Sequence, residues 1–161
     1  MKLAPFVHLL LMAVLAPTGS RAQAGEELNN LNRVHIVIEK LGPDEKNLGL
    51  TPDDLQAVAL AALKHDVPSL KFGETGPMLY VQIIALKTSC GYFADVRVKV
   101  ERLAAILDDN GKPAAKGTAI TVWDERNLLA GRPDEMVSRI NEKIRSLITR
   151  FAADYYRQNE R

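Results

Sequence analysis

The chain carries, at residues 78–86, the sequence MLYVQIIAL, which is apolar at even and odd positions alike. Such a run is typical of a strand in the middle of a sheet. The turn TSCG (88–91) leads into YFADVRVKVERLAAIL (92–107), where apolar residues alternate with charged ones, as in a strand with one buried and one wet face. DDNG (108–111) is a strong turn signal, and TAITVW (118–123) is then the return strand of an antiparallel meander.

One further strand and two helices flank this meander. VHIVIE (34–39) alternates and is rich in β-branched residues, which predicts a strand. TPDD (51–54) announces a helix, with Thr51 as N-cap and Pro52 in the first turn, and Pro68 ends it. GRPD (131–134) opens a second helix, whose apolar residues recur at helical spacing. These are Met136, Ile140, Ile144, Leu147, Ile148, Phe151 and Tyr155.

The order of these elements, β-α-β-β-β-α, predicts an α+β fold. We expect a single two-layer domain, a four-stranded mixed sheet with both helices on one face. Residues 67–72 would add a short fifth strand at an edge. The first helix provides the crossover that a parallel strand pair needs, and the meander follows.

The amino terminus has the three zones of a secretory signal. Lys2 is followed by an apolar stretch up to Ala16 and by AQA (22–24), a small-x-small cleavage pattern. The apolar stretch is shorter than the roughly 20 residues that span a bilayer. We therefore predict a signal peptide over residues 1–24, a domain over 25–161, and a periplasmic or secreted protein without membrane insertion after cleavage.

Charge and cysteine content exclude some functions. The 21 Lys and Arg nearly balance the 20 Asp and Glu, so no basic surface favours nucleic acid or anionic lipid. The single cysteine, Cys90, cannot form an internal disulfide, and a lipoprotein anchor would need a cysteine at the cleavage site. Cys90 is then inert or free for an intermolecular bond.

Candidate catalytic and metal-binding residues are few. His35 and Glu39 share one strand parity, but two ligands do not make a zinc site, and an exposed polar pair is the simpler interpretation. Cys90 lies in a turn without a sequence motif that supplies a base. We expect no catalytic residue, no metal and no cofactor.

A sheet with helices on one face leaves the other face outward. Parity places aliphatic, aromatic and charged residues there, a mixture that resembles the centre and rim of a protein interface. The alternative is that loops or the leader 25–32 cover its apolar part. We predict partner-binding residues on this face: His35, Tyr80, Ile84, Arg97 and Trp123.

Short motifs resemble those of a widespread group of small exported bacterial α/β proteins of uncharacterised function. They are GLT (49–51), LYV (79–81), GY (91–92), VW (122–123), and Phe151 with DYY (154–156). In architecture the chain is also similar to activators of penicillin-binding proteins, the curli export subunit and the amino-terminal domain of the Tol-system propeller protein. This resemblance implies a fold and, by analogy, action through binding other proteins.

Three functions follow as hypotheses. The first is a non-enzymatic envelope protein that binds another protein, or itself, through the open sheet face. The second is a small-ligand binder with a pocket between the sheet and residues 41–50, or between the helices. The third is a hydrolase that uses His35, Glu39 or Cys90.

Overall fold

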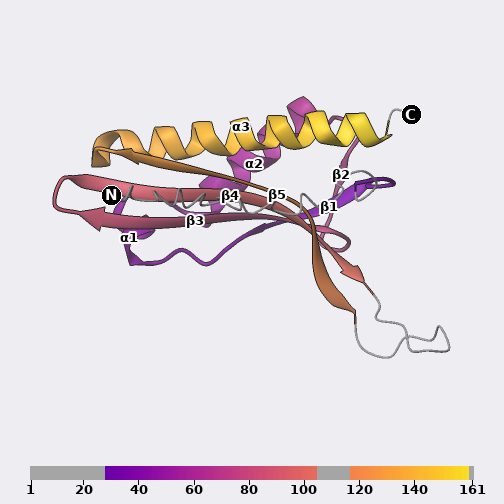
Figure 1. Cartoon of the computed structure of the whole chain (residues 1–161), viewed down its shortest axis with the longest axis horizontal. Coiled ribbons are helices and arrows are strands. Elements are labelled where there is room, and N and C mark those ends of the chain that lie inside the picture. Colours follow the sequence, from indigo (N-terminus) through magenta and orange to yellow (C-terminus); the bar gives the residue numbers. More distant parts are fainter. Residues whose placement is uncertain (1–27, 105–116, 160–161) are drawn as a thin grey trace, which may run out of the picture.

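Within residues 28–104 and 117–159, which the computed structural model describes, five strands form one mixed sheet in the order β2-β1-β3-β4-β5 (Figure 1). The elements are β1 (Arg33–Ile38), α1 (Pro43–Asn47), α2 (Pro52–Asp66), β2 (Lys71–Phe72), β3 (Met78–Thr88), β4 (Gly91–Ala104), β5 (Thr118–Gly131) and α3 (Pro133–Asn159). The two-layer α+β prediction is confirmed, and the short fifth strand is present as β2. The signal-peptide prediction lies outside the described residues.

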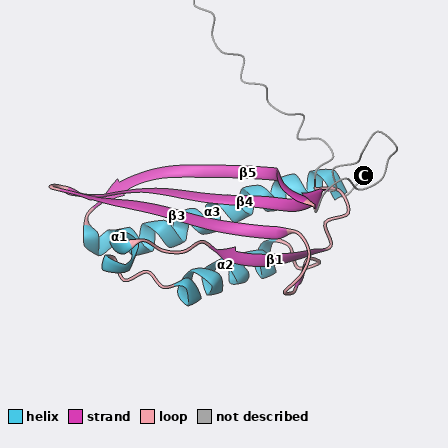
Figure 2. Ribbon diagram, turned by 90° about the horizontal axis from the view of Figure 1, so that it is seen from below, coloured by secondary structure: helices cyan, strands magenta, loops and turns pink. Residues whose placement is uncertain are grey.

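The sheet is parallel on one side and antiparallel on the other. β1 pairs in parallel with β2 and with β3, where Ile36 lies opposite Leu79. β3, β4 and β5 form the predicted antiparallel meander, with Val81 opposite Val98 and Val98 opposite Glu125. Figure 2 looks onto this sheet with α2 and α3 behind it, so one face carries no helix.

The core lies between the sheet and the two long helices. α2 contacts β1, α3 contacts β4 and β5, and the helices contact each other. Every residue of the apolar stripe predicted for the last helix is buried. Thr51 caps α2 as predicted, because its hydroxyl accepts a hydrogen bond from the Asp54 amide at 3.2 Å.

The described part of the leader packs at the end of α3. Leu28 and Leu31 are buried in the core. The backbone of Leu28 bonds to the side chains of Gln158 and Asn159 in the last turn of α3. Residues 28–32 therefore complete the helical side of the domain.

β5 is longer than the sequence predicted. The expected strand ended at Trp123, but β5 continues through DERNLLAG (124–131) to Gly131. Within this extension Asp124 and Arg126 are exposed while Leu129 is buried, so the alternation of a two-faced strand persists through polar residues. The polar run 124–127 is thus part of a strand because β4 lies beside it and supplies its backbone pairing partners.

A β-bulge changes the faces that β5 presents. Val100 of β4 lies opposite Trp123, but the next residue, Glu101, lies opposite Thr121. Val122 is therefore an extra residue, and both Val122 and Trp123 are buried. Counting alternate residues of β5 through this point, without the bulge, places Trp123 on the face away from the helices, which is the wrong face.

The loop after β1 protects an exposed strand edge. β1 pairs with β3 as far as Val81, which leaves the rest of that β3 edge without a strand partner. There the Glu45 side chain accepts a hydrogen bond from the Ala85 amide, and the Asp44 side chain accepts one from Lys87 at 2.9 Å. A Cβ at Gly42 would lie 2.6 Å from Glu45 Oε2, so glycine leaves room for this buried carboxylate.

The contact between the helices predicts a pH dependence. Asp66, at the end of α2, accepts hydrogen bonds from His65 and from the Thr149 hydroxyl of α3, each at 2.7 Å. These bonds, that of His65 first, lower the pKa of Asp66 below its ordinary value of 3.8. Because the folded pKa is depressed, this stabilisation is present above pH 4 and is lost as the pH falls through the folded pKa.

Asp66→Asn should therefore lower the free energy of unfolding at pH 7, and its difference from the parent chain should shrink at low pH. Urea unfolding from pH 7 down to the lowest pH at which the chain folds measures this. Glu74→Gln, at an exposed turn, is the control and should show no such pH-dependent difference. A difference for Asp66→Asn that stays constant through this range would contradict the assignment.

Candidate interaction surface

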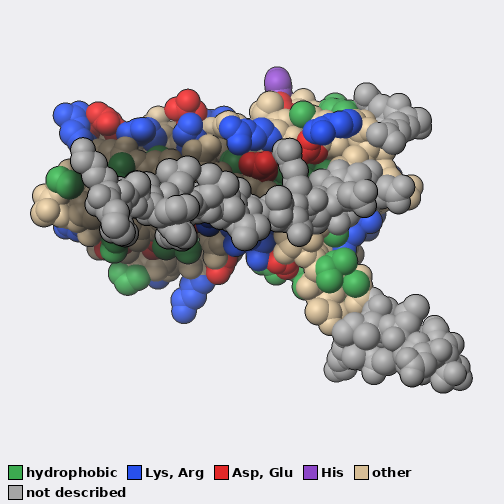
Figure 3. All heavy atoms as spheres, in the orientation of Figure 1, with side chains coloured by type: hydrophobic (Ala, Val, Ile, Leu, Met, Phe, Trp, Pro, Cys, Tyr) green, Lys and Arg blue, Asp and Glu red, His purple; other side chains and the backbone are tan. Residues whose placement is uncertain are grey.

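The face of the sheet without helices carries the residues that parity assigned to it, with one exception. Tyr80, Ile84 and Arg97 lie there as predicted, and their backbone neighbours Leu79, Ile83 and Val96 are buried on the helical side. We call this surface the open face. In Figure 3 hydrophobic and charged side chains project together from the lower side of the molecule, beneath the sheet.

Trp123 is the exception, and its assignment to this face was wrong. Its ring packs edge-on against Phe151 of α3, with centroids 5.4 Å apart. Its indole nitrogen Nε1 donates a hydrogen bond to the Asp154 carboxylate at 2.9 Å. The bulge at Val122 turns Trp123 toward the helices, so it is a core residue.

Four large hydrophobic side chains lie exposed at the end of the open face near the β3–β4 turn. Ile84 and Leu86 come from β3, Phe93 from β4 and Leu128 from β5, with exposed fractions of 56, 61, 54 and 74%. The register brings them together, since Leu86 lies opposite Phe93, and Asp95 lies between Ile84 and Leu128. We call these four residues the apolar patch. Single exposed apolar residues are ordinary, but a contiguous group of this kind marks an interaction site.

Of the four residues of the apolar patch, Ile84 was predicted from the sequence and the other three were not. Leu86 and Phe93 continue the parities of Ile84 and Asp95, so extending the same count by one step would have found them. Leu128 lies in the extension of β5, which the sequence did not reveal as a strand.

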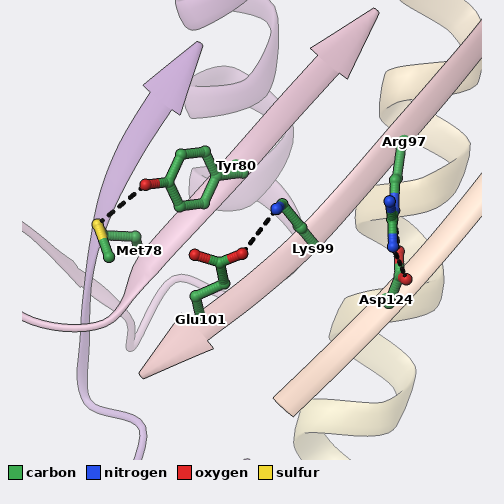
Figure 4. A network of polar contacts seen from close by, with 6 residues as sticks. All are labelled: Met78, Tyr80, Arg97, Lys99, Glu101 and Asp124. Carbon is green, nitrogen blue, oxygen red and sulfur yellow. Dashed lines mark hydrogen bonds and ion pairs between the residues drawn. The ribbon is translucent and has the colours of Figure 1, made fainter. Parts of the chain in front are cut away.

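A band of charged residues adjoins the patch (Figure 4). Arg97 of β4 donates two hydrogen bonds to the Asp124 carboxylate of β5. One runs from Nε to Oδ1 at 2.7 Å and the other from Nη2 to Oδ2. This hydrogen bonding, more than any other interaction, raises the pKa of Arg97 above its ordinary value. Lys99 pairs with Glu101 at 2.6 Å and lies 4.9 Å from the Tyr80 ring centroid, a cation–π distance. The band thus forms a polar rim beside an apolar centre.

His35 lies on the open face at its β1 side, because it is opposite Met78, which shares the parity of Tyr80, whereas Cys90 lies in the β3–β4 turn. His35 Nδ1 is 2.9 Å from the Gly73 carbonyl oxygen, at the β2 side of the sheet, so the ring is tied to the backbone. Cys90 is an exposed free thiol in the β3–β4 turn, and its side-chain contact is the Thr88 hydroxyl at 3.5 Å. The structure brings neither together with Glu39, which lies just beyond the end of β1.

The loop after β1, one of the two places predicted for a ligand pocket, packs side chains against the sheet. Leu41, Glu45 and Leu50 of the loop after β1 are buried. Pockets lie at the ends of the sheet, one of about 340 Å³ between Arg33 and Arg102 and one of about 460 Å³ beside Cys90. Across the described ranges no three His, Cys, Asp or Glu side chains are grouped as metal ligands. Nor is any helix within those ranges long and apolar enough to cross a membrane.

Comparison with known proteins places the chain in no family. No family model matches it, and no curated protein matches it either. The resemblance to a group of exported bacterial proteins therefore stays an expectation.

Among solved structures the likeness is distant. A PelC dodecamer from Paraburkholderia phytofirmans shares 14% identity over 85% of this chain and 94% of its own, with a TM-score of 0.43. A minor lipoprotein from Acinetobacter baumannii shares 11% over 77% and 94%, with a TM-score of 0.29. Uncharacterized lipoprotein B from Nitrosomonas europaea shares 14% over 80% and 88%, with a TM-score of 0.27. At these values we transfer no function, and the function has to be argued from the surface itself.

Proposed function

We propose that this chain is an exported, non-enzymatic envelope protein that acts by binding another protein through the open face of its sheet. The apolar patch is the observation that carries the proposal. Its four side chains come from three adjacent strands and remain largely exposed. The opposite face of the same sheet, by contrast, is covered by α2 and α3 and forms the buried core.

The layout of the face supports association over a merely solvated surface. A stable interface needs apolar side chains at its centre and satisfied polar groups around them. The patch provides the first, and the Arg97–Asp124 and Lys99–Glu101 pairs provide the second. These charged side chains are already held by one another, so little conformational freedom is lost when a partner covers them.

Export is the part of the proposal that rests on sequence alone. The charged start, apolar stretch and AQA (22–24) cleavage pattern are those of a secretory signal. An envelope location would bring the open face into contact with other exported chains. The non-enzymatic part rests on the same face, whose residues suit binding and whose Arg97–Asp124 and Lys99–Glu101 side chains are held in ion pairs rather than poised for proton transfer.

A photoreactive amino acid at position 84 tests the open face in cells that export the chain. We expect a discrete crosslinked adduct, because Ile84 lies within the patch and 56% of its surface is exposed. Leu128→Glu in the same chain should abolish the adduct, since a buried, unpaired carboxylate would oppose association.

Leu103→Glu is the matched control. It makes the same change at a similarly exposed leucine near the far end of β4, which shares the parity of the open face but lies beyond the charged band, away from the apolar patch. Both glutamate variants should unfold within about 0.5 kcal/mol of the parent chain. An adduct that survives Leu128→Glu, or the absence of any adduct at position 84, would refute the proposal.

A further inference from the structure

One carboxylate in the centre of the apolar patch lacks a hydrogen-bond donor. Asp95 Oδ1 is buried, and no described residue donates a hydrogen bond to it. Its cross-strand neighbours on the open face are Ile84 and Leu128, neither of which can donate. Arg97, two residues along β4, directs its guanidinium to Asp124 instead. An unsatisfied buried carboxylate oxygen is costly, and Asp95 as a whole is only half-buried, so its other oxygen stays open to a donor from outside the chain.

One cation next to it is also unpaired. Arg126 of β5 is exposed and makes no hydrogen bond or ion pair with another described residue. It lies directly opposite Arg97 in the β4–β5 ladder, where like charges are unfavourable. Asp95 and Arg126 are diagonal neighbours, since Asp95 faces Leu128 and Arg97 faces Arg126. The open face thus presents one unmet anion and one unmet cation side by side.

The charges of the whole face suit a partner of the same kind. Strands β4 and β5 place three acids and three bases on it: Asp95, Glu101, Asp124, Arg97, Lys99 and Arg126. A strongly acidic or strongly basic partner would meet as many like charges as opposite ones. A surface that cancels its own charge is complementary to a second copy when the two are related by a two-fold axis.

We infer that the partner of the open face is a second copy of this chain, packed face to face. A two-fold axis in the plane of the interface, passing between Asp95 and Arg126, brings each Asp95 to the partner's Arg126. The contact is isologous, so it forms two identical ion pairs, and it brings Leu128, which lies beside both residues, next to the partner's Leu128. This inference rests on the proposed function and names its partner.

Charge reversal with recombination of the variants tests the inference. Asp95→Lys alone sets Lys against the partner's Arg126, and Arg126→Glu alone sets Glu against the partner's Asp95. Each should weaken self-association about a hundredfold, because two symmetry-related contacts become repulsive. A mixture of the two single variants should form a heterodimer, since both of its contacts are then between opposite charges. The double variant should also dimerise.

The chain is purified after export and examined by analytical ultracentrifugation over a range of concentrations. Glu142→Lys and Arg145→Glu on α3 are the controls, since they make the same charge changes on the outer face of the helix and should leave the dimer intact. Thermal unfolding confirms that each variant is folded. Recovery of the dimer on mixing cannot come from misfolded chains, so it isolates the Asp95–Arg126 contact.

A parent chain that stays monomeric throughout would overturn the inference. So would single variants that dimerise like the parent, or a mixture that fails to associate. A monomeric parent whose position 84 still crosslinks to a different exported protein would leave the proposed function standing. A monomeric parent without any crosslink at position 84 would remove both.

Discussion

Trp123→Ala should lower the free energy of unfolding by about 3–5 kcal/mol, the usual cost of emptying a large aromatic site in a core. Trp123 is 7% exposed, packs edge-on against Phe151 and donates a hydrogen bond to Asp154. Its removal would leave a cavity between β5 and α3 and one carboxylate oxygen of Asp154 without its donor. Urea unfolding followed by far-ultraviolet circular dichroism measures the loss.

Ile84→Ala is the matched control for Trp123→Ala. Ile84 is also a large apolar residue of the sheet, but more than half of its surface is exposed. Its truncation should change the stability of the monomer by less than about 1 kcal/mol, because little packed surface is lost. A Trp123→Ala chain as stable as Ile84→Ala would show that Trp123 does not belong to the core.

The contrast between Trp123 and Ile84 shows which features of the fold the sequence patterns could predict. The apolar stripe of α3 and the Thr51 cap were predicted because helical spacing and capping are local properties. The alternation in β4 was predicted for the same reason, since each residue is flanked by the two that define its face. Parity also placed Ile84 and Arg97 on the open face.

Non-local pairing explains what the sequence could not reveal. The bulge at Val122 depends on the register between β4 and β5, and it reverses the face of Trp123. The polar run 124–127 becomes strand because β4 faces it, although its composition favours a turn. Leu128 was missed for that reason.

The unmet charges of the open face were likewise beyond the reach of sequence. Parity made Arg97 a candidate partner-binding residue. Which of the nearby acids it pairs with depends on the register of the strands, and the sequence does not give that register. Its bond to Asp124 leaves Asp95 unsatisfied, and this in turn shapes the inferred dimer.

Glu45→Ala should lower the free energy of unfolding by about 1–3 kcal/mol, because it leaves a buried amide without an acceptor. Glu45 is 4% exposed, and its carboxylate accepts the hydrogen bond of the Ala85 amide where β3 extends past β1. Glu45→Gln keeps an oxygen that can accept this bond, so its loss of stability should be smaller. Hydrogen exchange of the Ala85 amide, read by NMR, reports the bond directly.

Asp44→Ala is the control for position, because Asp44 protects the next amide of the same edge, that of Lys87. We expect Glu45→Ala to speed hydrogen exchange at the Ala85 amide but not at Lys87. Asp44→Ala should speed exchange at the Lys87 amide but not at Ala85. Unchanged exchange at Ala85 would mean that packing, and not the carboxylate, shields this amide.

The two acids together explain how a strand edge that lies beside the apolar patch is kept from pairing with other chains, since side-chain carboxylates already occupy its donors. In the proposed assembly, association is thereby directed to the open face, where the patch and the charges without a partner lie.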